Sequence, residues 1–255
     1  MFRVIRIAVL LFILVLVGLS TWLTQARSTD WNNSLWVKIY PINADGSEAS
    51  ARHIERLRLE HFNAIETFIR REAARYGHSL ERPVRIELGD GIGEQPPSIG
   101  DAPNRLTIML WSLKMRLWVA SVTDDTIEPD VRIFLRYHEP QYDVPLDNSV
   151  GMQKGMYGIV NAFASRAQRG SNNVIIAHEL LHTLGASDKY DPLTGQPRAP
   201  QGLAEPDRSP LYPQTKAEIM GGRIARSADT AEIPSSLSLA VIGAETAREV
   251  RLLRD

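Results

Sequence analysis

The sequence predicts an α+β protein, a sandwich in which a mixed β-sheet packs on helices. Short alternating apolar segments indicate strands at 35–40, 84–88, 130–137 and 157–164. Longer segments with apolar residues three and four positions apart indicate helices at 49–76 and 104–118. The length of 255 residues and the hydrophobic content of 44% suit one domain after a short N-terminal segment.

The N-terminal segment is apolar and follows positive charge. Arg3 and Arg6 precede an uncharged run from Ile7 to Leu23, close to the length of a membrane-spanning helix. Positive residues favour the cytoplasmic side, so we expect residues 1–26 to form a transmembrane signal anchor. Residues 27–255 would then form a domain outside the cytoplasm, periplasmic or extracellular. The alternative is a signal peptide whose cleavage releases a secreted protein.

The first strand and helix of the domain are read from their patterns. Leu35 to Tyr40 alternates, and Pro41 is expected to end the strand. One long helix is expected over 49–76, with an apolar stripe made of Ile54, Leu57, Phe62, Ile65, Phe68, Ile69 and Ala73.

The later elements follow the same logic. Pro83 precedes the strand 84–88, and Asn104 is the expected N-cap of the helix 104–118. That helix has an apolar face of Leu106, Met109, Leu110, Leu113 and Leu117, and its aromatic and methionine side chains are expected in the core. A last helix is expected to start at Pro234, with Leu237, Val241, Ala244, Val250 and Leu253 in register.

Composition excludes several classes of function. The net charge of −1 gives no electrostatic reason to expect nucleic acid binding. The chain has no cysteine, which excludes disulfides, cysteine-rich zinc modules and a thiol nucleophile.

The strongest functional signal lies in the segment 178–188. His178 and His182 are four residues apart, so on a helix they share one face and can bind one metal ion, for which Zn²⁺ is the usual occupant. Gly185 lets the helix end, and Asp188 can then return as a third ligand. Glu179 can reach water at the open position and act as general base.

The surroundings of this segment favour a metal site over a solvated helix face. Apolar residues cover nearly the whole helix: Val174, Ile175, Ile176, Ala177, Leu180, Leu181 and Leu184. Such a helix should be buried, and buried polar side chains need partners, which one metal ion supplies to all three ligands.

The pattern from about Ser171 to Arg223 resembles the metzincin clan of zinc peptidases. The resemblance rests on two segments: residues 178–188, which match a variant H-E-x-x-H-x-x-G-x-x-D of the clan's motif, and the methionine turn at residues 217–222. The continuation L-G-x-x-D-x-Y-D resembles bacterial secreted members. A tyrosine that follows the methionine in some metzincins is absent here, where Gly221, Gly222 and Arg223 stand.

The resemblance implies a fold and a substrate site. A twisted mixed sheet would pack on long helices, followed by the active-site helix, the methionine turn and a C-terminal helix. Met220 would form a packing floor beneath one zinc ion without binding it. The strand 157–164 would be an edge strand that pairs with extended peptide or protein substrate through Tyr157, Ile159, Asn161 and Phe163.

Three functional hypotheses follow. The first is a membrane-anchored zinc endopeptidase with His178, His182 and Asp188 as ligands and Glu179 as base. The second is a gluzincin-type peptidase in which Glu205 replaces Asp188 as the third ligand. The third is a catalytically inactive, zinc-stabilised binding module of the cell envelope, which would need a fourth protein ligand.

Overall fold

The computed structural model describes residues 5–7, 11, 12, 15, 29–98, 104–140 and 149–253. A five-stranded sheet with the order β2-β1-β3-β5-β4 lies at its centre. The neighbours β2, β1, β3 and β5 are parallel, and β4 runs antiparallel at one edge. The strands are β1 (Leu35–Asn43), β2 (Val84–Leu88), β3 (Val131–His138), β4 (Val150–Met152) and β5 (Tyr157–Phe163). The expected mixed α/β architecture is therefore confirmed.

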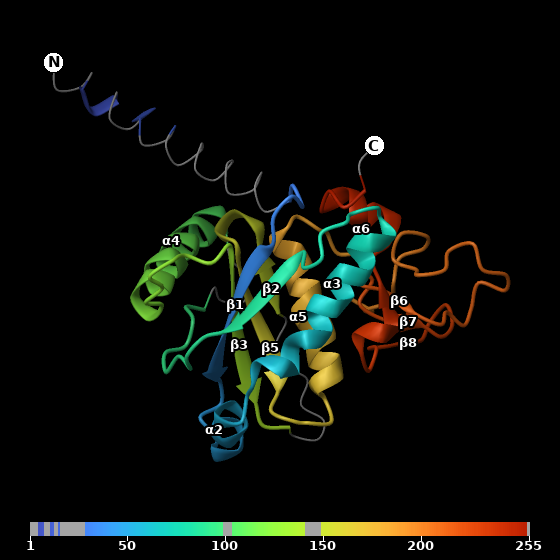
Figure 1. Cartoon of the computed structure of the whole chain (residues 1–255), viewed down its shortest axis with the longest axis horizontal. Helices are drawn as coiled ribbons and strands as arrows, with labels where there is room; N and C mark the ends of the chain where they lie inside the picture. The colour runs from blue at the N-terminus through green and yellow to red at the C-terminus, as the bar shows by residue number, and fades with distance from the viewer. Residues whose placement is uncertain are drawn as a thin grey trace.

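Helices cover both faces of this sheet (Figure 1). On one face lie α3 (Asn63–Arg75) and α5 (Arg169–Thr183), within the larger apolar core. On the other face α4 (Arg105–Val122) packs in a smaller core. Strand β1 serves both cores, because successive side chains point to opposite faces: Ile39 belongs to the larger core and Tyr40 to the smaller one.

Strand β1 runs through Pro41, which the sequence predicted to end it. Pro41 pairs with Leu135 of β3, and its carbonyl accepts a hydrogen bond from the Ile92 amide on the opposite side. The regular pairing with β2 already ends at Ile39 and Leu88. The N–H and the C=O of one strand residue point to the same side, so the N–H that proline lacks would point away from β3, toward the β2 side. The regular pairing with β2 has already ended there, so no hydrogen bond is lost and proline is tolerated.

The single helix predicted over 49–76 is two helices. They are α2 (Glu48–Glu55) and α3, and a 3₁₀ turn η1 (Leu59–Phe62) lies between them. Arg58 is extended, with φ −138° and ψ 152°. Leu57 and Phe62 are both buried but lie five residues apart, so on one continuous helix they would point in different directions. The break between α2 and α3 lets both side chains face the core.

Helix α4 packs through a different face from the expected apolar stripe. Asn104 caps it as predicted, accepting a hydrogen bond from the Thr107 amide. Trp111, Met115 and Trp118 are buried against the sheet, as expected for its aromatic side chains. Four of the residues predicted as its apolar face are largely exposed instead: Met109, Leu110, Leu113 and Leu117.

The predicted C-terminal helix is mostly not helical. It consists of a 3₁₀ turn η3 (Leu237–Leu239), a short strand β9 (Ala240–Val241) and one short helix α6 (Ala244–Glu249). Strand β9 pairs in parallel with β6 (Ala217–Glu218), which draws the chain out of a helix. The remaining elements are the turn η2 (Gln153–Gly155) and the hairpin of β7 (Ile224–Ala225) and β8 (Ala231–Glu232).

The predicted membrane anchor falls mainly on residues outside those the structure describes. Of the run Ile7–Leu23, only residues 7, 11, 12 and 15 are described, and they are helical. Across the described ranges, no helix is both long and apolar enough to cross a membrane. The anchor therefore stays a prediction.

Candidate metal centre

Helix α5 ends where the motif requires a change of direction. Gly185 has φ +106°, a left-handed conformation that glycine adopts at little cost. The Gly185 amide donates to the carbonyl of His182, and the Ala186 amide donates to that of Leu181. This pair of bonds is a Schellman motif, and it turns the chain back toward the helix so that Asp188 can approach the histidines.

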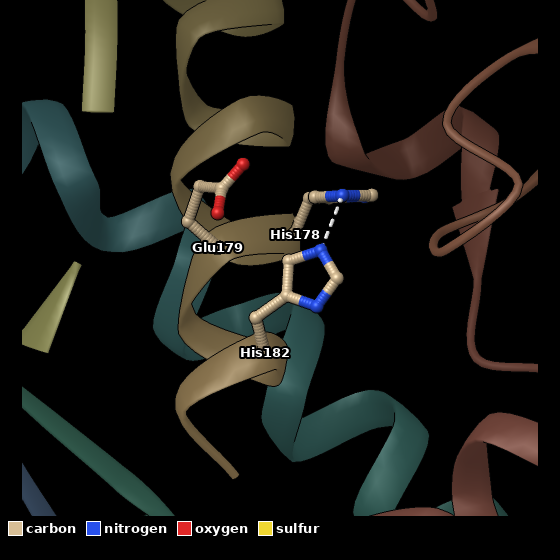
Figure 2. Close-up of side chains that lie close together, drawn as sticks. All are labelled: His178, Glu179 and His182. Carbon is tan, nitrogen blue, oxygen red and sulfur yellow. Dashed lines mark hydrogen bonds between the residues drawn. The ribbon is translucent and has the colours of Figure 1, made fainter. Parts of the chain in front are cut away.

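Three side-chain atoms converge beside the last turns of α5. The Nε2 atoms of His178 and His182 lie 3.0 Å apart. Oδ1 of Asp188 lies 3.2 Å from Nε2 of His178 and 3.0 Å from Nε2 of His182. Figure 2 shows the two imidazoles meeting edge to face, with Glu179 beside them on the same helix. The ligand group predicted from sequence spacing is thus brought together.

Hydrogen bonds fix the protonation of both rings. Nδ1 of His178 lies 2.9 Å from the carbonyl oxygen of Ile219, and Nδ1 of His182 lies 2.8 Å from that of Ala186. A carbonyl oxygen only accepts, so each Nδ1 carries the proton and donates it. Each Nε2 of the neutral ring then presents a lone pair to the shared point, as metal-binding histidines do.

The geometry fits a divalent metal ion. Two nitrogen lone pairs and a carboxylate oxygen repel one another at these distances unless a cation lies between them. A tetrahedral ion about 2.0 Å from each ligand atom keeps those atoms about 3.3 Å apart, close to the separations of 3.0, 3.0 and 3.2 Å. A buried group that includes His178, Glu179 and His182 could therefore hold a metal ion.

The charges of the group support one another. Burial lowers the pKa of His182, but the carboxylates of Asp188 and Glu179 and the Ala186 carbonyl together raise that pKa overall. Burial also opposes ionisation of Asp188, yet the two imidazoles beside its carboxylate hold its pKa well below its usual range. Asp188 is therefore ionised at neutral pH and supplies the one negative charge of the ligand set.

Glu179 is buried next to the metal group. Glu179 is 5% exposed, and this burial raises the pKa of its carboxyl. Its Oε2 has no hydrogen-bond partner, although it is buried. Burying a polar atom without a hydrogen-bond partner costs free energy. An unpaired carboxylate oxygen is, however, available to accept a proton during a reaction.

The methionine turn supports the first histidine from below. Ile219, which accepts the hydrogen bond from His178, and Met220 are fully buried in the larger core. Buried Glu218 holds the turn: its Oε2 accepts from the Met220 and Gly221 amides, and its Oε1 accepts from the Gly243 amide and the Thr246 hydroxyl. One carboxylate thus joins the turn to the start of α6.

A second carboxylate fastens the segment that carries Asp188. Glu249 of α6 accepts hydrogen bonds from the amide and hydroxyl of Ser187 and lies 2.6 Å from Nζ of buried Lys189. The Lys189 amide donates to the carbonyl of Met220. The residues on either side of Asp188 are therefore held to α6 and to the methionine turn.

Other candidates from the sequence lie elsewhere. The carboxylate of Glu205 accepts hydrogen bonds from the amide and hydroxyl of Thr215 and pairs with Arg208, so it is not part of the converging group. Asp191 accepts hydrogen bonds from the amides of Leu193 and Thr194, so its side chain stabilises the turn that follows it.

The strand predicted at the edge of the sheet is not the edge. Strand β5 lies between β3 and β4, and its residues Tyr157 and Asn161 are buried, while Ile159 and Phe163 are half-buried. Residues 157–159 of β5 pair with β4. The edge position belongs to β4, which therefore replaces β5 as the candidate substrate strand.

Sequence reasoning assigned no role to two residues of this centre. Gly151 of β4 lies against α5: a Cβ there would be 2.4 Å from the carbonyl oxygen of Glu179 and 2.5 Å from Cβ of His182. Tyr190, two residues after Asp188, has its ring centroid 6.2 Å from that of His178. The available signals were one glycine in a short apolar segment and one tyrosine beside the motif.

Comparison with models of known protein families finds no match, and a search of curated proteins finds none either. The metzincin resemblance therefore rests on the motif and the methionine turn alone.

Proposed function

We propose that the protein is a zinc-dependent endopeptidase, with its catalytic domain at residues 27–255 held outside the cytoplasm by a membrane anchor at residues 1–26. The convergence of His178, His182 and Asp188 on one point is the observation that carries this proposal. Two imidazoles and one carboxylate are a ligand set of catalytic zinc, which keeps an open position, whereas structural zinc is closed by a fourth protein ligand.

The residues around the ligands support hydrolysis. When bound, zinc supplies Lewis-acid polarisation of a peptide carbonyl and activation of water. Glu179 takes a proton from the water as the water oxygen attacks the carbonyl carbon. It then gives that proton to the amine nitrogen as the C–N bond breaks. Burial raises the pKa of Glu179 toward neutral pH, and a pKa closer to the working pH suits a group that both accepts and returns a proton.

The edge of the sheet offers a place for the substrate chain. Strand β4 lies at the end of the strand order, and its Gly151 lies against α5 at Glu179 and His182. An extended peptide added to this edge would be held by backbone hydrogen bonds, with little dependence on its sequence. A peptide or protein substrate with an unfolded segment is therefore the proposed substrate class.

One observation favours a second candidate, the inactive zinc-stabilised module. Ligand atoms of His178, Glu179 and His182 lie within 4.8 Å of one another, so Glu179 could itself become a ligand and close the site. In that case Glu179 would no longer be available as a base. The two candidates predict different results for Glu179→Gln. The inactive module would lose its metal, whereas the peptidase would keep the metal and lose only its activity.

Removal and return of zinc test the proposed reaction. We expect the full-length protein to cleave an unfolded protein substrate, to lose that cleavage in a chelator and to regain it when zinc is added back, because the Asp188 ligand is open to solvent. Product fragments identified by mass spectrometry would measure the cleavage. Cleavage that continues in the chelator, or its absence from zinc-loaded protein, would reject the proposal.

A further inference from the structure

The exposed apolar side chains of this protein are concentrated in two segments. Fifteen large apolar side chains are exposed among the described residues, and ten of them lie either in the first fifteen positions or in α4. The five in α4 are Ile108, Met109, Leu110, Leu113 and Leu117. Exposed apolar residues gathered on one helix indicate a contact surface, whereas single ones do not.

Four of these five side chains, all except Ile108, form one continuous stripe that faces away from the sheet. Trp111, Met115 and Trp118 define the buried side of the helix. Residues advance about 100° along a helix, which places Met109, Leu113 and Leu117 within about 80° of one another on the opposite side. Leu113 and Leu117 are 57% and 65% exposed. In Figure 1 this helix forms the outermost layer on its side of the sheet.

Positive charge borders this stripe. Lys114 and Arg116 are exposed, and they lie about 100° and about 60° from Leu113 on its two sides. The sequence of α4 contains no aspartate or glutamate. An apolar helical stripe with basic side chains on its borders is a feature of helices that lie in the interface of a membrane containing anionic lipids.

We propose that α4 lies flat on an anionic phospholipid bilayer, with the stripe of Met109, Leu110, Leu113 and Leu117 (the α4 stripe) in the acyl boundary. This inference builds on the membrane-anchored peptidase proposed above and adds a second point of membrane contact. A second copy of the chain is disfavoured as the occupant, because a symmetric contact through α4 would bring the basic borders of both stripes together.

The contact would orient the catalytic centre. Helix α5, which carries the two histidine ligands, lies on the opposite face of the sheet from α4 (Figure 1). A bilayer against α4 therefore lies across the sheet from the metal centre, which opens toward the aqueous compartment. The substrates of an enzyme held in this way are water-soluble proteins or peptides, and not segments inside the bilayer.

Fluorescent probes at single cysteines test this contact. The chain has no cysteine, so Leu113→Cys and Leu193→Cys each provide one labelling site in the full-length protein. Leu193 is 94% exposed and lies outside α4, which makes it the matched control. In vesicles of phosphatidylglycerol and phosphatidylcholine, we expect the emission of an environment-sensitive probe at 113 to shift to the blue and to be quenched by lipids with nitroxide-labelled chains. The probe at 193 should do neither.

The charge on the border gives a second readout. Lys114→Gln, combined with the probe at 113, should reduce insertion into vesicles with anionic lipid about fivefold, since one lysine near such a surface contributes about 1 kcal/mol. Insertion into pure phosphatidylcholine should be weaker and unaffected by this change. Equal insertion in both lipids would refute the electrostatic part of the proposal.

The outcomes separate this inference from the proposed function. A probe at 113 that stays in water in anionic vesicles overturns the membrane contact. A blue shift that depends on protein concentration and not on lipid also overturns it, in favour of self-association. Chelator-sensitive cleavage, measured on the same labelled proteins, reports on the peptidase independently, so either proposal can fail while the other stands.

Discussion

Replacing Glu179 by glutamine is expected to abolish most peptide hydrolysis while the metal stays bound. Glutamine keeps the shape of the side chain but cannot take a proton from water, and loss of a general base typically lowers the rate about 10²–10⁴-fold. The ligands His178, His182 and Asp188 are unchanged, so zinc per chain should stay at the wild-type level. The turnover number and the zinc content of the same purified samples measure the two effects.

Glu245→Gln is the matched control for this variant. Glu245 is an exposed glutamate at the start of α6 that pairs with Arg248, and its change should leave both readouts at the wild-type level. A Glu179→Gln enzyme as active as the wild type would show that Glu179 is not the base. A variant that loses its zinc would show that Glu179 is a ligand, as the inactive-module hypothesis requires.

Replacing Glu218 by alanine should produce the largest loss of stability among the residues around the centre. Glu218 is fully buried and accepts four hydrogen bonds, from Met220, Gly221, Gly243 and Thr246. Alanine leaves these donors buried without an acceptor, which should cost about 3–5 kcal/mol of the free energy of unfolding. Zinc affinity should fall as well, because the same turn positions the carbonyl of Ile219 that orients His178.

Urea unfolding followed by circular dichroism measures this loss. The control is Glu232→Ala, which removes an exposed carboxylate paired with Arg226 and should leave the midpoint unchanged. If Glu218→Ala and Glu232→Ala unfold at the same urea concentration, the carboxylate of Glu218 does not hold the methionine turn.

The ligand group could be predicted from the sequence because its spacing is local. His178 and His182 meet through the pitch of one helix, and Gly185 supplies the reversal that brings Asp188 back. No long-range information is needed for these three residues. The same holds for β2, which lies at the predicted positions, and for the N-cap Asn104.

The features that the sequence did not predict correctly depend on contacts between distant segments of the chain. Glu218 and Glu249 act through partners in other elements, and nothing near them in the sequence marks those partners. Strand β4 is three residues long, too short to give a pattern, and without it the sequence predicts β5 as the edge strand. Helix α4 is apolar on several sides, and only the sheet decides that Trp111 and Trp118 turn inward and Leu113 outward.

The zinc content of three proteins tests the coordination sphere most directly. The wild type, Asp188→Ala and Glu205→Ala should be purified in the same way, dialysed against a weak chelator and analysed by atomic emission. We predict one zinc ion per chain in the wild type and in Glu205→Ala, and little or none in Asp188→Ala. Zinc retained by Asp188→Ala but lost from Glu205→Ala, or a wild type that binds none, would contradict the proposed centre.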